Sequence, residues 1–138
     1  MPLTLEIITP DGIAWQGRDV DAVVLPTRCG EIEILPGHIP LITILNAGAV
    51  GVIRKGVETD LAVDIGYVRC SGDVVSVLTE AAIEVSNLDK NDIEKAKEEA
   101  LKAVAEAKKN RLDDDEIERL EAMARFSMAK LLAKARKR

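Results

Sequence analysis

The sequence predicts a β + α protein, in which an N-terminal sandwich or flattened barrel of roughly ten strands precedes a C-terminal antiparallel helical hairpin. In the first part, turn signals rich in Gly, Pro, Asn and Asp recur roughly every 8–12 residues between short apolar runs, a spacing typical of sandwiches and barrels. Beyond Ser86 the chain has neither glycine nor proline, and apolar residues recur at helical spacing instead. We therefore divide the chain into a β domain, residues 1–86, and a helical hairpin, residues 87–138.

Alternation and intervening turns identify the strands of the first part. Leu3, Leu5 and Ile7 alternate with polar residues before a turn at residues 10–12. A short run then surrounds Trp15, and no helical pattern stands between the strands, as βαβ units would require. The remaining strands are expected at residues 20–25 (ended by Pro26), 31–34, 41–45, 49–53, 57–65, 67–70 and 74–78.

A rigid corner is predicted within residues 30–43, around the only histidine of the chain. Leu-Pro-Gly at residues 35–37 forces a turn, because proline restricts φ and glycine accepts the left-handed region. Pro40 then opens a second apolar strand, at a position where a missing N–H is tolerated. His38 is thereby held at the tip of the corner. We expect this corner to contact a partner rather than to serve as a flexible linker.

Two narrow apolar stripes predict the helices of the second part. Residues 86–89 offer several N-cap candidates, and an aspartate in the corner at residues 110–114 is expected to cap the second helix. The first stripe is Ile93, Ala96, Ala100, Val104 and Ala107. The second is Ile117, Leu120, Ala124, Met128, Leu131 and Ala135. Since buried alanine contributes far less than the roughly 1.5–3 kcal/mol of buried leucine, the hairpin is expected to be weakly held, and a mobile and a static hairpin both remain open.

Charge is distributed unevenly between the two parts. Residues 1–86 carry five basic and twelve acidic side chains, whereas residues 87–138 carry fourteen basic and twelve acidic ones. From Arg125 onward there are six basic residues and no acidic one. This basic end could be a solvated helix terminus, a phosphate-binding surface or a docking site for an acidic protein segment. The acidic total and the lack of stacking aromatics argue against a nucleic-acid partner.

No constellation of residues predicts catalysis. His38 has no second histidine to pair with, the serines lie outside nucleophile motifs, and no phosphate-binding glycine loop occurs. The acidic run at residues 113–116 is explained by the helix N-terminus that it accompanies, and Cys29 and Cys70 are expected to be reduced thiols. We expect no enzymatic activity, metal or cofactor, and no stretch reaches the roughly 20 apolar residues that span a bilayer.

Residues 30–43, GEIEILPGHIPLIT, are similar to the G-E-[LI]-x-I-L-P-G-H-x-P-L-[LI]-T signature of the epsilon subunit of bacterial and chloroplast F-type ATP synthases, the mitochondrial delta subunit. The resemblance covers essentially the whole chain, and the order of a β domain and an Ala-rich hairpin is also that of the family. Further matches are residues 7–12, Gly66-Tyr67, residues 74–78 and Ala81-Ala82.

The resemblance implies a non-catalytic rotor subunit of the central stalk. Such subunits couple rotation of the membrane c-ring to the catalytic head during proton-driven ATP synthesis, and their extended hairpin blocks ATP hydrolysis. The implied partners are the gamma subunit, the c-ring, and the catalytic beta and alpha subunits, with membrane association only through the complex. The implied location is the cytoplasmic face of the inner or plasma membrane, or the stromal face of a thylakoid.

The resemblance also implies three interaction sites by position. The gamma-subunit interface would comprise His38, Pro40, Leu41 and Thr43. The loop facing the c-ring would comprise Arg28, Cys29, Gly30 and Glu31. The helix facing acidic segments of the beta subunits would present Arg119, Arg125, Lys130 and Lys134.

Two positions depart from the family pattern. Some members bind ATP in the folded hairpin through a motif of the form [IL]-D-x-x-R-A, whose matching positions here are Leu88, Asp89 and Asp92. Asp92 replaces the arginine, and an acid there would repel phosphate oxygens that a guanidinium would bind, so we expect weak or no ATP binding. The other departure is Asp64-Ile65-Gly66, where the family often has paired glycines, and it is expected to affect only a strand corner.

Three functions remain open on the sequence. The leading one is a stalk subunit that couples rotation to synthesis and inhibits ATP hydrolysis through its helices. The second is a purely structural coupling subunit with a permanently folded hairpin. The third is a β-sandwich adaptor unrelated to ATP synthase.

Overall fold

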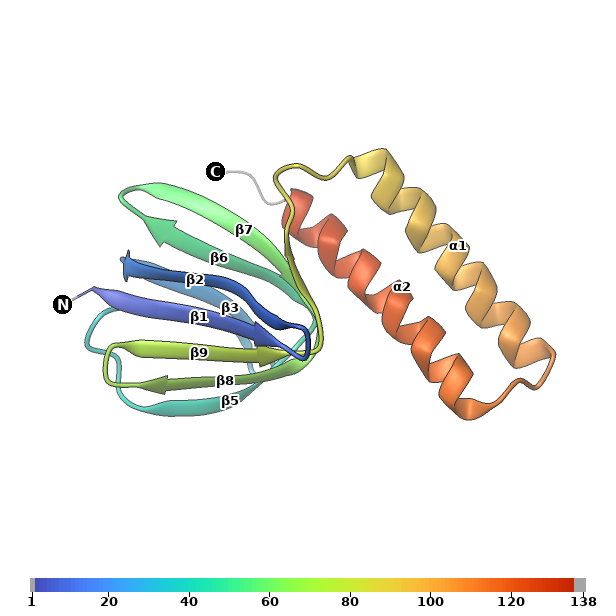
Figure 1. Cartoon of the computed structure of the whole chain (residues 1–138), viewed down its shortest axis with the longest axis horizontal. Coiled ribbons are helices and arrows are strands. Elements are labelled where there is room, and N and C mark those ends of the chain that lie inside the picture. The colour runs from blue at the N-terminus through green and yellow to red at the C-terminus, as the bar shows by residue number, and fades with distance from the viewer. Residues whose placement is uncertain (1, 136–138) are drawn as a thin grey trace.

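A computed structural model describes residues 2–135, which form a β domain and two C-terminal helices (Figure 1). The strands are β1 (Leu3–Thr9), β2 (Gly12–Val20), β3 (Ala22–Thr27), β4 (Gly30–Ile34), β5 (Leu41–Leu45), β6 (Gly48–Arg54), β7 (Val57–Val63), β8 (Gly66–Ser71), β9 (Val74–Thr79) and β10 (Ala82–Glu84). The helices are α1 (Lys90–Lys109) and α2 (Asp114–Ala135). The predicted fold class is confirmed.

The strands form one sheet that curls into a nearly closed barrel. Along the sheet the order is β10-β7-β6-β3-β5-β8-β9-β1-β2, and β4 pairs with β3 beside this path. Strand β1 runs parallel to β9, whereas the other pairs are antiparallel. Near the closure, the guanidinium of Arg54 on β6 donates to the Arg18 carbonyl of β2 at 3.1 and 2.8 Å and lies over the Trp15 ring.

The core lies inside this barrel and is aliphatic. Successive side chains of a strand point to opposite faces of the sheet, so alternate residues point inward. Leu3, Leu5 and Ile7 of β1 are fully buried, as their alternation predicts. They share one cluster with Val75 and Val77 of the neighbouring β9. Packing of Val, Leu and Ile thus supplies the core that the few aromatic residues cannot.

The sequence predicts one strand over residues 20–25, but the structure divides it at Asp21. The backbone N–H of Asp21 donates to the Ile53 carbonyl, and its carboxylate accepts the Lys55 N–H, both at 2.8 Å. These contacts hold Asp21 against the end of β6 and separate β2 from β3. Strand β3 also continues past Pro26, where the sequence predicts its end. Proline lacks a backbone N–H, but the Pro26 carbonyl still accepts the Asn46 N–H at 2.8 Å.

An aspartate caps each helix: the sequence predicts one for α2, and for α1 the structure selects Asp89 among the candidates at residues 86–89. The Asp89 carboxylate accepts the Asn91 N–H at 2.8 Å and caps α1. The Asp113 carboxylate accepts the Asp115 N–H at 3.4 Å at the start of α2. The helices are antiparallel, and α2 lies between the β domain and α1, which forms the outer layer (Figure 1).

The position of α2 explains why its predicted stripe is only partly right. A helix that packs on two sides needs more than one narrow buried face. Ala124 is buried as predicted, but Met128 is 43% exposed. Ala129 and Ala133, which lie outside the predicted stripe, are buried in a cluster with Ala62 of β7.

The predicted stripe of α1 is closer to the structure, because this helix packs mainly on one side. Ile93, Ala100 and Ala107 are buried, Val104 is half-buried, and Ala96 is exposed.

Candidate functional site

The described part of the chain, residues 2–135, contains no group of three or more His, Cys, Asp or Glu side chains that could hold a metal ion. Within the same residues, neither helix combines the length and the apolar composition needed to cross a bilayer. The candidate sites are surfaces. They comprise one face of the β domain, one turn, and the interface between α2 and the β domain.

The corner between β4 and β5 has the predicted form. The His38 N–H donates to the Leu35 carbonyl at 3.1 Å, and Gly37 adopts a positive φ of 85°. Nδ1 of His38 lies 2.6 Å from the Ile39 carbonyl oxygen, so the ring is held against its own loop. Pro40 is exposed beside it. The corner is a stiff surface feature, and its histidine is engaged with the backbone.

Strand β5 presents a different set of side chains from the one that the resemblance implies. Leu41 pairs with Cys70 and Thr43 pairs with Val68, and both partners are buried, so Leu41 and Thr43 lie on the core side. The outward side chains of β5 are the two isoleucines: Ile42 is 74% exposed and Ile44 is 39% exposed. A partner on this face would contact Ile42 and Ile44.

An apolar row runs across the outer face of five neighbouring strands. Residues directly opposite each other on paired strands share one face of the sheet. The register pairs Ile44 with Tyr67, Tyr67 with Leu78, Leu78 with Ile8, and Ile8 with Ile13. Tyr67 and Ile13 are each 60% exposed, and Leu78 is 49% exposed. We call these five residues the apolar row.

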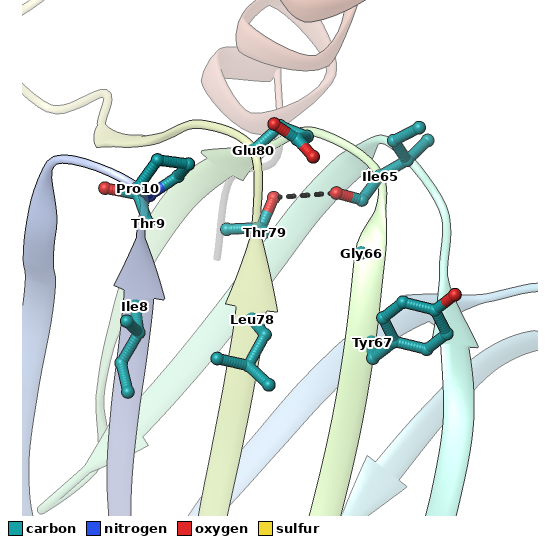
Figure 2. A pocket seen from close by; sticks show the side chains of 9 residues that line it. All are labelled: Ile8, Thr9, Pro10, Ile65, Gly66, Tyr67, Leu78, Thr79 and Glu80. Carbon is teal, nitrogen blue, oxygen red and sulfur yellow. Dashed lines mark hydrogen bonds between the residues drawn. The ribbon is translucent and has the colours of Figure 1, made fainter.

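Three residues of the apolar row, Ile8, Tyr67 and Leu78, line a shallow pocket at the end of the sheet. Figure 2 shows Ile8, Leu78 and Tyr67 side by side on adjacent strands, below the Thr79 hydroxyl that bonds to the Ile65 carbonyl at 3.2 Å. The pocket has a volume of about 300 Å³. The next row on the same face carries Arg69 and a 2.7 Å hydrogen bond from the Ser76 hydroxyl to Glu6. An apolar strip beside a polar rim is typical of a protein interaction site.

The turn implied to face the c-ring joins β3 to β4 and is exposed at Arg28, Cys29, Gly30 and Glu31. It is internally ordered: the Thr27 hydroxyl donates to the Gly30 carbonyl at 2.6 Å and accepts the Cys29 N–H at 3.3 Å. Gly30 has a positive φ of 108°. The turn is thus exposed and held in shape by its own hydrogen bonds.

Each of the four basic residues named on α2 has a contact within the chain. Arg119 pairs with Glu116 one turn earlier, and Lys130 lies 4.9 Å from the centre of the Phe126 ring. Lys134 Nζ donates to the carbonyls of Val85 and Ser86, each at 3.1 Å. Residues 136–138, the rest of the predicted basic end, lie outside the described residues.

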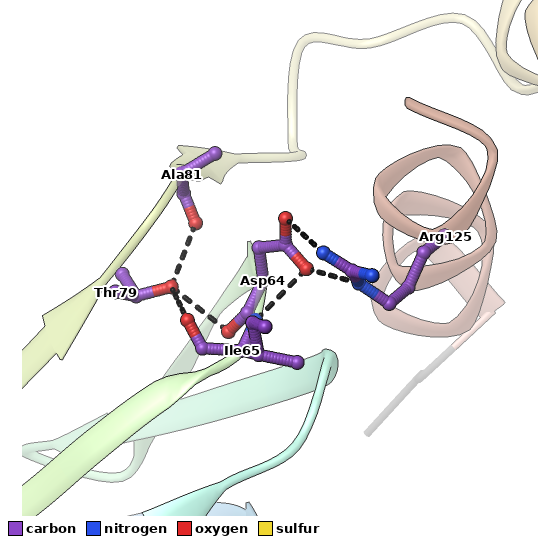
Figure 3. Close-up of polar contacts among 5 residues, drawn as sticks. All are labelled: Asp64, Ile65, Thr79, Ala81 and Arg125. Carbon is purple, nitrogen blue, oxygen red and sulfur yellow. Dashed lines mark hydrogen bonds and ion pairs between the residues drawn. The ribbon is translucent and has the colours of Figure 1, made fainter. Parts of the chain in front are cut away.

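Arg125 joins α2 to the β domain through a largely buried carboxylate. Its Nε and Nη2 donate to the two carboxylate oxygens of Asp64 at 2.6 and 3.1 Å (Figure 3). The hydrogen bond with Asp64 raises the pKa of the Arg125 guanidinium above its usual value. Asp64 therefore does more than alter a strand corner, contrary to the expectation from the sequence. It joins the β domain to the hairpin.

The three positions of the degenerate ATP motif have structural roles or face solvent. Leu88 packs against the cluster of small residues between α2 and the β domain. Asp89 caps α1, and Asp92 is exposed in the first turn of that helix. These positions place two carboxylates, and no guanidinium, at the start of α1.

The fold defines a class of two-part protein, in which a β-sandwich domain is followed by a helical hairpin. Residues 2–85 match the family described as ATP synthase, Delta/Epsilon chain, beta-sandwich domain. The chain belongs to this family and is an epsilon subunit of an F-type ATP synthase, in which it is a non-catalytic stalk subunit. This membership excludes the unrelated adaptor.

Relatives in two bacteria illustrate the family. The ATP synthase epsilon chain of Halalkalibacterium halodurans is 43% identical over 112 residues, which cover 80% of this chain and 83% of that one. The epsilon chain of Ligilactobacillus salivarius is 34% identical over 133 residues, covering 94% of this chain and 92% of the relative. The second relative extends the similarity through the helices.

A solved structure supports the fold. A chain in the mitochondrial ATP synthase of Euglena gracilis, in an assembly of OSCP, F1 and c-ring, superposes with a TM-score of 0.70 at 23% identity. The match covers 93% of this chain and 78% of that one. The arrangement of β domain followed by helices is therefore shared with a protein of low sequence identity.

Proposed function

We propose that this subunit docks on the rotor through the outer face of its β domain, couples c-ring rotation to ATP synthesis, and restrains ATP hydrolysis through its helices. The observation that carries the proposal is the separation of the two surfaces. The apolar row lies on β5, β8, β9, β1 and β2, whereas α2 packs on β6 and β7. The hairpin can therefore change its position while the β domain stays docked.

The apolar row is suited to a permanent contact with a gamma-type stalk subunit. Its side chains are large and exposed, and they project from paired strands, so little conformational entropy is lost when a partner covers them. His38 and Pro40 extend the surface at the corner before β5. The turn from Arg28 to Glu31 would reach the c-ring and so bring the subunit to the membrane side of the synthase.

The helices supply the regulatory part of the proposal. In the docked form, Arg125 and Lys134 bind the β domain. Once released, the same side chains would be available to acidic segments of the catalytic beta subunits. A second function, a structural subunit with a permanently folded hairpin, is favoured by the same two contacts, because they stabilise the docked form.

Deletion of residues 87–138 from the reconstituted complex distinguishes these two functions. If the hairpin inhibits, the rate of ATP hydrolysis rises while the β domain stays bound to the complex. The full-length subunit is the control. An unchanged rate, with the shortened subunit still bound, would leave only the structural function.

Substitution in the apolar row tests the docking surface. Tyr67→Ser and Leu78→Ser together remove most of the exposed apolar area at the centre of the row, and we expect the affinity for the gamma-type subunit to fall about a hundredfold. Val57→Ser is the matched control, because Val57 is 65% exposed but lies at the start of β7, outside the row. Equal affinities for the two variants would refute this docking face.

A further inference from the structure

The ion pair between Asp64 and Arg125 connects a rigid site on the β domain to a helix. The Asp64 side chain lies just beyond the end of β7 and is only 5% exposed, whereas that of Arg125 is 37% exposed. Two parallel N–H···O bonds between a guanidinium and a carboxylate fix orientation as well as distance. The pair therefore favours one position of α2 on the β domain.

The carboxylate is held in place by its own domain. Its Oδ1 accepts the Ile65 N–H at 2.8 Å, and the backbone carbonyl of Asp64 accepts the Thr79 hydroxyl at 2.8 Å (Figure 3). The same hydroxyl lies 3.2 Å from the Ala81 carbonyl oxygen. The Thr79 side chain thus connects the loop between β7 and β8 to the segment that follows β9. Asp64 is thus in position before the helix docks.

The apolar contacts around the pair are small. The cluster between α2 and the β domain is built from Ala62, Val85, Ala129 and Ala133, with Phe126 and Leu88 at its margin. Alanine side chains bury little area, so they permit close approach but contribute little free energy. Polar contacts consequently decide much of the balance between the docked and the released hairpin.

We propose that Asp64 and Arg125 form a latch, and that Arg125 exchanges partners when the hairpin is released. In the docked form its guanidinium binds Asp64. In the released form the same N–H groups bind a carboxylate of an acidic segment in the catalytic head. The second half of this statement rests on the proposed function; the first half concerns the isolated chain alone. The contact with Asp64 needs the docked position of α2, whereas the contact with an acidic segment needs the released position, so the two contacts are mutually exclusive.

Because Asp64 and Arg125 differ in exposure, substitutions of the two residues are expected to release the hairpin to different extents. Arg125→Gln leaves a carboxylate that is almost fully buried and without its cation, and such a charge strongly destabilises the docked form. Asp64→Asn leaves a guanidinium that still reaches water, and the amide oxygen of asparagine can keep the bond to the Ile65 N–H. The double variant contains neither an unpaired carboxylate at position 64 nor an unpaired guanidinium at position 125. Release should therefore be greatest for Arg125→Gln, smaller for Asp64→Asn, and smaller in the double variant than in Arg125→Gln.

Distances between spin labels in the isolated full-length subunit measure this balance. Cys29 is exposed and Cys70 is buried, so the native Cys29 and an introduced Lys109→Cys on the hairpin take the labels. We expect Arg125→Gln to raise the ratio of released to docked hairpin about tenfold or more, and Asp64→Asn about threefold. Arg119→Gln is the matched control on the same helix, because its ion pair is exposed and lies within α2.

A wild-type distance distribution in both Asp64→Asn and Arg125→Gln would overturn the latch. The latch would also be overturned if the free-energy change for hairpin release in the double variant equalled the sum of the changes in the two single variants. The two residues would then act independently.

Hydrolysis by the reconstituted complex tests the partner exchange separately. Asp64→Asn frees Arg125 and should lower the hydrolysis rate. Arg125→Gln also opens the hairpin but lacks the guanidinium for the acidic segment, so it should inhibit less than Asp64→Asn. If Asp64→Asn opens the hairpin and the rate is unchanged, the latch stands and the inhibitory function fails. If both variants open and inhibit equally, Arg125 does not exchange partners.

Discussion

At the residue scale, the conformation around His38 could be predicted from the sequence, whereas the partner of Asp64 could not. His38 lies at a turn whose Pro and Gly neighbours are adjacent in the chain, and the structure confirms the predicted corner. Asp64 pairs with a residue 61 positions away, and no local pattern marks that pairing. Local conformation is encoded by neighbours, whereas the partner of a buried charge is set by the fold.

Gly66 is a residue whose side chain is excluded by a backbone contact. A Cβ at this position would collide with the Leu78 carbonyl oxygen of the paired strand β9. We expect Gly66→Ala to lower the free energy of unfolding by about 3 kcal/mol, because a backbone carbonyl cannot move aside as a side chain can.

Denaturant unfolding checks this expectation against Gly48→Ala. A Cβ at Gly48 would lie 3.2 Å from the Pro26 ring, so a small shift accommodates it and the loss should stay below about 1 kcal/mol. Equal losses for the two variants would contradict the argument.

The two cysteines should react with thiol reagents at very different rates. Cys29 is exposed in the β3–β4 turn, whereas Cys70 is buried on β8. Burial, and secondarily the charge of Asp73, raise the pKa of the Cys70 thiol, so at a given pH less of it is the reactive thiolate. We expect Cys29 to be modified in the native protein at pH 7–8 and Cys70 only in denaturant. Mass spectrometry of wild type and Cys29→Ser measures both, and native labelling of the Cys29→Ser chain would contradict the prediction.

At the element scale, the existence of strands and helices follows from periodicity, but their outward faces do not. The β5 sequence Leu-Ile-Thr-Ile-Leu is apolar on both faces, so either alternation is compatible with it. Only the pairing with β8 shows that Leu41 and Thr43 face the core and that Ile42 and Ile44 face outward. Similarly, the extra buried alanines of α2 follow from its place between two neighbours. Its sequence pattern alone does not show them.

The β domain should fold without the hairpin. Its main core cluster consists entirely of residues from the strands, whereas the contacts to α2 form a separate, small cluster. We expect residues 1–86 to unfold cooperatively in denaturant, monitored by circular dichroism, and residues 87–138 alone to lack a cooperative transition, since Ala-rich helices bury little area. A fragment 1–86 without native strand signal would show that the helices are required for the fold.

At the scale of the whole molecule, the β domain presents two surfaces on different strands. The apolar row lies on β5, β8, β9, β1 and β2, whereas α2, which lies beside the β domain in Figure 1, packs on β6 and β7. This arrangement suits a subunit that stays attached at one surface while it changes state at the other.

The folded hairpin is not expected to bind ATP. Asp89 is engaged as a helix cap, Asp92 adds a negative charge, and Arg125 is bound to Asp64. Calorimetry of the isolated subunit should detect no binding at micromolar concentrations, and a micromolar affinity would contradict this expectation. Asp92→Arg should bind ATP more tightly than wild type, because it replaces a repelling charge with a donor of paired hydrogen bonds.

By itself the sequence determined the order of β domain and hairpin, the turns, the aspartate cap of the second helix, and, through residues 30–43, the family. These features depend on side chains that are close in the chain or on a contiguous motif, so they can be read from it directly. The tertiary structure decided which face of β5 points outward, how five separate strands align the apolar row, and that Asp64 meets Arg125. Each of these depends on strand register or on packing between distant segments, because interactions across the fold select among arrangements that the local sequence permits equally.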